Sequence, residues 1–259
     1  MDVLAGLEAA VGEAGYTMLL ALTGSDARLT VERLEHMARR GVDGVVLEGC
    51  VISPALGKRL EALRAAGVAV VLQNMDMPDG KFDRVTIEMP RNSAKVVRHL
   101  IELGHRRIAL IRRPDDRWRL EGYRAALAEF GIAFDERLIL DFTPETDPPS
   151  WARERLLSLK DRPTAVFAMS DRLAGEIVLD LLEAGWRVPG DVSVAAINDL
   201  WYTPALRVPL TTLRVPVKRI GRECGRLLLE RIKQPGKPFE EVEIEEELVV
   251  RESTAAPAC

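Results

Sequence analysis

Residues 165–215, AVFAMSDRLAGEIVLDLLEAGWRVPGDVSVAAINDLWYTPALRVPLTTLRV, contain two apolar strand-like runs that each end in polar side chains. The run AVFAM is followed by Ser170 and Asp171, and the run VSVAAI by Asn198 and Asp199. A predicted helix and a Pro-Gly-Asp turn lie between the runs, an order typical of neighbouring parallel strands. Ligands of open parallel sheets bind beyond the carboxyl ends of the strands. We therefore expect these four residues to lie where a small polar molecule is held.

The rest of the chain repeats this alternation of helix and strand. Glycine follows several predicted helices, as in the left-handed cap of a tight turn into a strand. The predicted helices are 2–14, 30–40, 55–66, 91–103, 118–130, 150–159, one ending at Gly185, and 217–233; the other predicted strands are 17–22, 44–47, 68–72, 85–87, 108–112, 138–142 and 242–250. The strands are continuous aliphatic runs, which indicates helices on both faces of a sheet. The pattern predicts a doubly wound parallel α/β fold.

Four further motifs occur in a fixed order around these runs. They are LGHRRIALI at 103–111, RLEGYRAAL at 119–127, PLTTL at 209–213 and ELVVREST at 247–254. Together with residues 165–202 they resemble the effector-binding core of the LacI/GalR family of bacterial transcriptional repressors. The resemblance implies a sugar-like or nucleobase-like effector sensor, not an enzyme. It covers almost the whole chain.

The resemblance also implies a periplasmic-binding-protein-like fold of type I, with two doubly wound lobes joined by three crossovers. The N-terminal lobe would comprise 1–88 plus 216–233, and the C-terminal lobe 89–215 plus 234–259. The crossings would lie near 88–92, 213–217 and 234–239. A ligand held between two hinged lobes would drive their closure.

One departure concerns the start of the N-terminal lobe. In the family this lobe begins with a strand between those at 17–22 and 44–47, whereas this sequence begins directly on a helix. We expect that the first strand, a hinge helix and a DNA-binding helix-turn-helix lie outside the given sequence; the alternative is an authentic start, with Asp2 capping the helix. The strands at 17–22 and 44–47 should then pair directly or leave a poorly packed gap. Weak effector binding, and low hydrogen-exchange protection of helix 2–14, are the expected consequences.

Arg119 is the first candidate ligand contact, by its match to an arginine three residues before the family's Gly-Tyr pair. A guanidinium can grip two oxygens at once; the alternative is a solvent-facing helical arginine. Asn198 and Ser170 replace residues common in the family, which would alter the hydroxyls or ring nitrogens that are recognised. Asp171 belongs to the same candidate site, although capping of the following helix is its first expected role.

Aromatic residues supply the other candidates of the second lobe. Trp151 and Trp201 are expected to stack on a sugar or base ring, with Trp118 and Tyr202 at the same ends of elements. From the first lobe, Gln73 and Asn74 follow a strand end and match a ligand-contacting position of the family. Arg119, Ser170, Asn198 and Trp151 are expected to converge on one cleft that Gln73 or Asn74 faces.

Composition and charge limit the remaining classes of function. Lys and Arg number 36 against 40 Asp and Glu, a net charge of −4, so the chain has no basic footprint for DNA; operator DNA would be bound only through the missing head. Three cysteines without ligand-like spacing and the absence of a leader pattern favour the cytoplasm. No catalytic, metal or cofactor motif is present, and His105 is expected to make a structural hydrogen bond. A homodimer is expected, as in the family.

Two other classes stay open. A solute-binding protein of a sugar transporter could share the fold, and would carry an export signal. A small α/β enzyme would need a proton-transfer residue in the cleft.

Overall fold

The chain forms two compact α/β units, each built from two separate stretches of sequence. The computed structural model describes residues 2–24, 26–49, 53–75, 81–143, 146–147 and 150–258; Cys50 and Cys259 lie outside them. The first unit comprises Met1–Ile87 with Pro216–Glu245, and the second comprises Glu88–Val215 with Glu246–Cys259. The chain therefore passes from one unit to the other three times.

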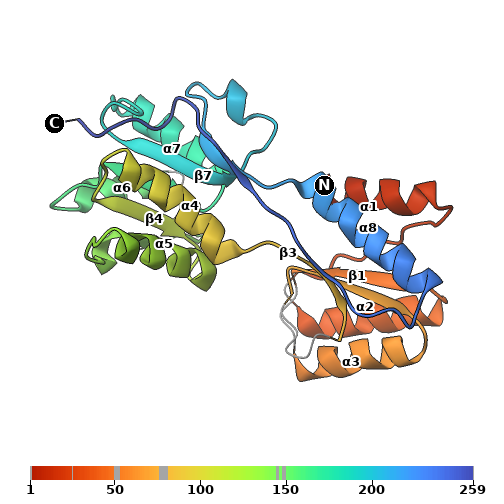
Figure 1. The fold of residues 1–259 in the computed structure, drawn as a ribbon. Helices are drawn as coiled ribbons and strands as arrows, with labels where there is room; N and C mark the ends of the chain where they lie inside the picture. Colours follow the sequence, from red (N-terminus) through yellow and green to blue (C-terminus); the bar gives the residue numbers. More distant parts are fainter. Residues whose placement is uncertain are drawn as a thin grey trace. The chain divides into compact units, whose positions relative to one another are not determined.

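The first unit is a parallel sheet with two helices on each face (Figure 1). The strand order is β1-β2-β3-β9, with all pairs parallel. Helices α1 and α8 cover one face, and α2 and α3 cover the other. The elements are α1 (Asp2–Glu13), α2 (Ala27–Arg39), β1 (Gly44–Glu48), α3 (Pro54–Ala65), β2 (Ala69–Gln73), β3 (Asp83–Thr86), α8 (Val217–Lys233) and β9 (Glu241–Glu243).

Glycines let α1 and α8 approach closely. A Cβ atom at Gly221 would lie 2.0 Å from the Val3 carbonyl oxygen, and one at Gly6 would lie 2.2 Å from the Lys218 carbonyl oxygen. No larger residue fits at these crossings without moving the backbone. The contact fixes α1 on the sheet through α8.

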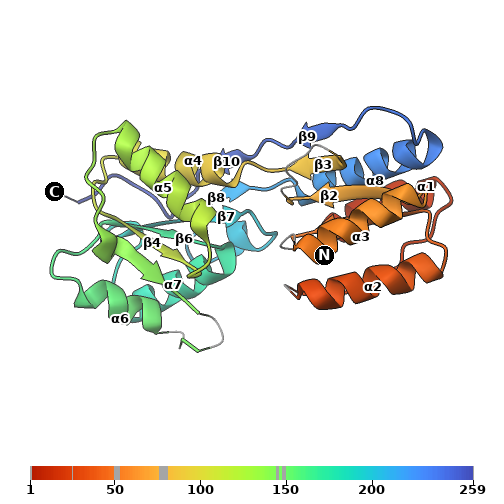
Figure 2. The same cartoon turned by 90° about the horizontal axis from the view of Figure 1, so that it is seen from below.

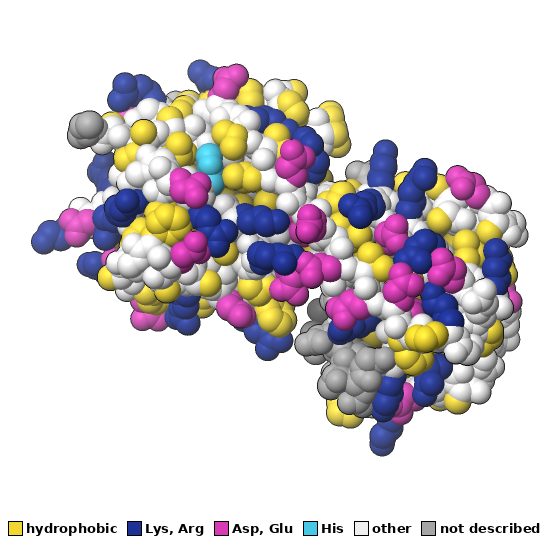
Figure 3. Space-filling view, in the orientation of Figure 1, with side chains coloured by type: hydrophobic (Ala, Val, Ile, Leu, Met, Phe, Trp, Pro, Cys, Tyr) yellow, Lys and Arg dark blue, Asp and Glu magenta, His cyan; other side chains and the backbone are white. Residues whose placement is uncertain are grey.

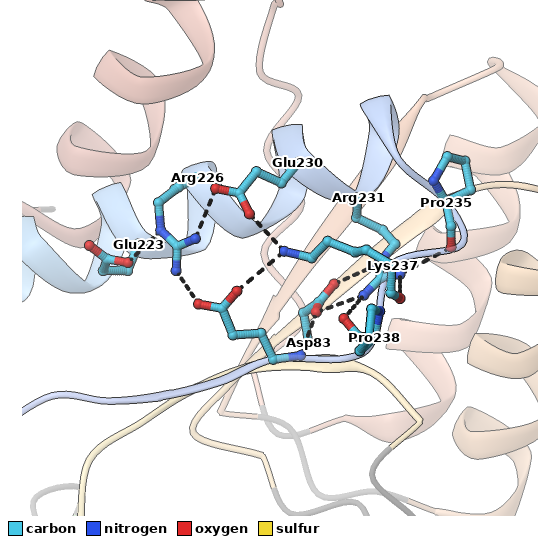
Figure 4. Close-up of polar contacts among 9 residues, drawn as sticks. Asp83, Glu223, Arg226, Glu230, Arg231, Pro235, Lys237 and Pro238 are labelled. Atoms are coloured by element: carbon cyan, nitrogen blue, oxygen red, sulfur yellow. Dashed lines mark hydrogen bonds and ion pairs between the residues drawn. The ribbon is translucent and has the colours of Figure 1, made fainter.

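A buried ion-pair network joins the end of α8 to β3 and β9 (Figure 4). Arg231 donates from Nε and Nη2 to the two oxygens of Asp83, at 2.8 and 2.9 Å, and Asp83 is fully buried. The other bonds of Arg231 go to the carbonyl oxygens of Pro235, Lys237 and Pro238. Because every oxygen and nitrogen of the pair has a partner, the buried charges are compensated.

The second unit is a six-stranded sheet in the order β10-β8-β7-β6-β4-β5. Figure 2 shows α4 and α5 on one side of β4 and β6, and α6 and α7 on the other. Successive residues of β4 follow this division: Ile108 and Leu110 pack with α4 and α5, and Ala109 and Ile111 with α6 and α7. The elements are α4 (Met89–Glu102), β4 (Ile108–Arg112), α5 (Arg117–Glu129), β5 (Ile139–Asp141), α6 (Trp151–Ser158), β6 (Ala165–Ala168), α7 (Asp171–Glu183), β7 (Ser193–Asn198), β8 (Thr211–Arg214) and β10 (Glu247–Val249), with 3-10 turns at Glu136–Leu138 and Thr203–Ala205.

Two predicted strands differ from the structure. Residues 17–22 form no strand, because no described strand lies beside them to accept their backbone hydrogen bonds. The predicted strand 242–250 is two strands in different units: β9 pairs in parallel with β3, and β10 pairs antiparallel with β8. Residues 234–245 therefore belong to the first unit. The resemblance had implied instead that they belong to the C-terminal lobe.

The described surface has mixed charge, and Figure 3 shows both signs interspersed over the visible face of each unit. Among the described residues, every helix is too short or too polar to cross a bilayer.

Candidate functional site

The candidate site lies where the strand order of the second unit reverses. From β4 the chain continues to β5 on one side, and then to β6 on the other side of β4. In open α/β sheets such a switch point leaves a crevice outside the carboxyl ends of the strands. The Met169 N–H donates to the Ile111 carbonyl oxygen at 2.9 Å. Ser170 therefore leaves the sheet beside the loop that leads to Arg119.

Arg119 is held at the start of α5 and does not extend into solvent. Asp116 caps the helix by accepting from the Arg119 N–H at 3.2 Å, and its other oxygen accepts from Arg119 Nη1. The Arg119 side chain is 15% exposed. Its Nε is buried and has no hydrogen-bond partner among the described residues. The solvent-facing alternative is thus wrong, and the guanidinium keeps an unused donor.

The RLEGYR motif explains why α5 is placed this way. A Cβ atom at Gly122 would lie 2.0 Å from the Pro90 carbonyl oxygen and 2.7 Å from the Ser93 Cβ, so glycine allows α4 and α5 to touch. The Tyr123 hydroxyl donates to the Ile108 carbonyl oxygen at 2.8 Å, and burial raises the pKa of Tyr123. These contacts fix α5 against α4 and β4, one turn after Arg119.

Arg112 organises the loop between β4 and α5, and no motif of the sequence predicted this role. Its Nη1 donates to the carbonyl oxygens of Arg113, Pro114 and Asp116 at 3.2, 2.9 and 3.3 Å. Its Nη2 lies 3.0 Å from Asp141 Oδ1. The loop that carries the helix cap is therefore built around one buried guanidinium.

Ser170, and not Asp171, caps α7. The Ser170 hydroxyl accepts from the Leu173 N–H at 3.4 Å. Asp171 is fully buried; one oxygen accepts from the Leu200 N–H at 2.7 Å, and the other accepts from the Thr212 hydroxyl. The expectation that Asp171 caps the helix was wrong, because the side chain turns inward to the ends of β7 and β8. Burial raises the pKa of Asp171 to about 6.

The turn after β7 has an unusual backbone. Asn198 has φ 134° and Asp199 has φ 57°, both in the region that favours glycine. Asp199 accepts from Arg251 at 2.6 Å, from Arg214 at 2.7 Å and from Thr203 at 2.9 Å. Burial alone would raise the pKa of Asp199, but these hydrogen bonds lower it. Such strain is maintained only where the surroundings determine it, and it is frequent at ligand sites. The backbone conformation of this turn leaves the half-buried Asn198 side chain at the end of β7.

The two tryptophans expected to stack on a ligand, Trp151 and Trp201, differ in exposure. The Trp151 ring is half-buried, packs on the core and lies 5.4 Å from the Phe142 ring. Trp201 is 87% exposed and meets the Tyr202 ring edge-on at 5.7 Å. Of these two rings Trp201 has the exposed flat face, so the role of Trp151 in stacking stays a prediction that requires a partly covered ring.

Gln73 and Asn74 lie at the end of β2 in the first unit. Gln73 is 4% exposed, and its Oε1 has no partner among the described residues. Asn74 has φ 51°, and its Oδ1 accepts from the Ile87 N–H at 3.0 Å. Asn74 thus secures the chain just before it leaves the first unit. That either residue faces the second unit stays a prediction.

The structural role expected for His105 is confirmed. Its Nδ1 is 2.8 Å from the Thr164 hydroxyl, and its Nε2 is 3.1 Å from the Ser193 hydroxyl and 2.9 Å from the Ala255 carbonyl oxygen. Burial lowers the pKa of His105. The ring therefore ties β7 and the C-terminal tail to the start of β4. Within the described residues, no three His, Cys, Asp or Glu side chains are grouped to hold a metal ion.

Comparisons with known proteins agree with this geometry. Residues 97–254 match the family described as periplasmic binding protein-like domain. The HTH-type transcriptional repressor PurR of Vibrio atlanticus (strain LGP32) is 29% identical over 254 residues, which are 96% of this chain and 75% of that protein. The solved complex of the transcriptional regulator CelR with cellobiose is 33% identical, with a TM-score of 0.83, over 98% of this chain and 78% of that one.

A LacI family transcriptional regulator from Enterococcus faecium, solved with bound ribose, is 25% identical, with a TM-score of 0.83, over 99% of this chain and 94% of that one. The fold of the two units is thus that of a periplasmic binding protein-like domain. Within that class, the chain belongs to the LacI family of transcriptional regulators. The relatives named above are transcriptional regulators.

Proposed function

We propose that this chain is the effector-sensing part of a LacI-type regulator, and that a sugar-like or nucleobase-like molecule binds at the strand ends of the second unit. Closure of the two lobes on the ligand would control DNA binding by a helix-turn-helix outside this sequence. The regulator would act as a homodimer in the cytoplasm. Relatives solved with ribose and with cellobiose support a small polyhydroxyl ligand.

The observation that carries the proposal is the state of Arg119. Its guanidinium is positioned by Asp116 at the switch point, and its buried Nε has no hydrogen-bond partner in the part of the chain that the structure describes. A buried donor without an acceptor costs free energy, and a ligand oxygen would remove that cost.

The other candidates receive different roles. Ser170 and Asn198 would contact ligand hydroxyls or ring nitrogens, and Trp201 with Trp151 would cover a ring face. Asp171 is a positioning residue in this scheme, because both of its oxygens are already bonded within the unit. Gln73 or Asn74 would complete the site from the first unit.

Isothermal titration against ribose, cellobiose and a panel of nucleobases tests the proposal. For a ligand that binds, Arg119→Ala should cost about 1.5 to 3 kcal/mol, which raises the Kd about 10- to 150-fold. Arg124→Ala is the matched control, since Arg124 is exposed on the same helix. Equal affinities of the two variants would show that Arg119 is not a ligand contact and would overturn this site.

A further inference from the structure

A glutamate with a buried side chain lies where the chain passes into the second unit for the last time. The first unit ends at Glu245, and the second unit resumes at Glu246. Side chains alternate along this stretch, because Glu245 and Glu247 are exposed whereas Ile244 is buried. Glu246 is only 6% exposed. The alternation therefore places a carboxyl at an inward position, where an aliphatic side chain is expected.

Three buried oxygen atoms at this position accept no hydrogen bond from the described residues. They are Oε1 and Oε2 of Glu246 and Oδ1 of Asn92. Asn92 is the fourth residue of α4, and its side chain is buried beside Glu246. A buried acceptor without a donor costs free energy. The pair is thus short of one hydrogen-bond donor.

A proton on Glu246 would supply this donor. An ionised carboxylate only accepts hydrogen bonds, whereas a protonated carboxyl also donates one, and a primary amide both donates and accepts. The Glu246 hydroxyl could then donate to Asn92 Oδ1, while the Asn92 amide donates back to the Glu246 carbonyl. The ionised form leaves Asn92 Oδ1 without a partner and adds an uncompensated buried charge.

The cations of α4 do not cancel the effect of burial. Lys95 Nζ donates to the backbone carbonyl oxygen of Glu246 at 3.0 Å, and Arg91 lies one turn earlier on the same helix. Burial raises the pKa of Glu246, and Asn92, Lys95 and Arg91 lower it by a smaller amount. The position therefore favours the protonated carboxyl more than water does.

The charges on the other side of Glu246 are largely balanced. Its own segment contributes the exposed Glu245 and Glu247. Strand β8, which pairs with β10, contributes Arg214, whose Nη1 lies 3.2 Å from a carboxylate oxygen of Glu247. The groups that bear most directly on Glu246 are thus those of α4.

We propose that Glu246 is a proton-dependent latch, which holds the returning chain on α4 while its carboxyl is protonated and releases it when the carboxyl ionises. The latch acts where the first and third crossovers lie together, because the Ile244 N–H donates to the Thr86 carbonyl oxygen at 2.8 Å two residues earlier. A rise in pH would therefore loosen this pair of crossovers. The latch is independent of the effector site at Arg119.

Amide hydrogen exchange at Ile244 tests the latch. The Arg84 N–H, which donates to the Glu240 carbonyl oxygen at 2.9 Å in the same unit, is the internal reference for the stability of that unit. From about pH 5 to about pH 8, the protection factor of Ile244 relative to Arg84 should fall about threefold or more in the unaltered chain. Glu246→Gln is neutral at every pH and should keep the ratio constant. The matched control is Glu245→Gln, at an exposed neighbour, and it should behave as the unaltered chain does.

Four results would overturn the latch. They are a constant ratio in the unaltered chain, an equal fall in Glu246→Gln, loss of the fall in Glu245→Gln as well, and a ratio that follows the Mg²⁺ concentration at constant pH, which would assign the position to a cation.

A second measurement applies if Glu246→Gln does not fold. Carbon-13 NMR follows the Glu246 Cδ resonance of the unaltered chain with pH, in the folded state and in urea. The folded chain should titrate at higher pH than the chain in urea. Titration at the same pH, or at lower pH, in the folded chain would overturn the latch.

Discussion

Replacement of Gly122 by alanine should destabilise the second unit, although the same change usually stabilises a helix. Alanine in place of glycine in a helix interior gains about 0.5 to 1 kcal/mol. Here the new Cβ would lie 2.0 Å from the Pro90 carbonyl oxygen, whereas carbon contacts are favourable near 3.5 to 4.0 Å. Both atoms in the clash are tied to backbone, so α4 and α5 must separate.

The expected cost is that of overpacking, about 1 to 3 kcal/mol in total after the helical gain is included. Unfolding in urea, followed by tryptophan fluorescence, isolates this unit because all four tryptophans belong to it. With an m-value of about 2 kcal/mol/M, the midpoint should fall by about 0.5 to 1.5 M.

Gly175→Ala is the matched control, in the interior of α7 in the same unit. Its Cβ would lie 3.6 Å from the nearest atom, Leu206 Cδ1, which is an ordinary contact. This variant should be more stable by about 0.5 to 1 kcal/mol. If Gly122→Ala raised the urea midpoint as Gly175→Ala does, the close packing of α4 on α5 would be refuted.

Three further experiments test the buried side chains Arg231, Asp171 and Cys224. Arg231→Met leaves Asp83 buried without its charge partner and should destabilise the first unit by about 3 to 5 kcal/mol in circular-dichroism melts, whereas Arg187→Met, at an exposed pair, should change stability by less than about 1 kcal/mol. Burial raises the pKa of Asp171 to about 6, so the folded chain keeps a proton that the unfolded chain releases near pH 4. The stability of the fold should therefore fall as the pH rises from about 4 to 6, and Asp171→Asn should remove this dependence on pH. An unchanged dependence in Asp171→Asn would contradict the assignment of the raised pKa to Asp171. Burial raises the pKa of Cys224 to about 12, so its alkylation at pH 8, followed by peptide mapping, should be much slower in the folded chain than in urea, and equal rates would contradict its burial.

Local sequence was sufficient for most elements of the fold. The aliphatic runs predicted β4 and β6 within a residue of their observed ends, and α8 at both of its ends. The glycine after each early helix does adopt a positive φ, as at Gly41 and Gly67. These signals act over a few residues, so they can be read without knowledge of the sheet order.

The strand predictions that were wrong all involve partner strands that are distant in sequence. A run such as TMLLAL becomes a strand only beside another strand, and its sequence does not say whether one is there. Likewise residues 242–250 contain no glycine or proline that would mark a break, although the chain changes sheets within them.

The same holds for the site. Arg119 and Ser170 could be proposed from motifs, but the inward turn of Asp171 depends on Thr212 and Leu200, which are 41 and 29 residues away. In the sequence, Arg112 is one of several arginines in residues 112–119, and only the structure shows that its side chain is buried.

The packing of α1 on α8 has a consequence for synthesis on the ribosome. Leu7 and Val11 of α1 are buried in the finished unit, and α1 packs on Gly221 and Gly225 of α8, more than two hundred residues later. At about 5 to 20 residues per second, translation needs on the order of 10 to 40 s to reach α8. Until then the apolar face of α1 has no permanent cover, and β3 lacks its β9 neighbour. The first unit, although it begins the chain, is therefore completed only after most of the second unit has been made.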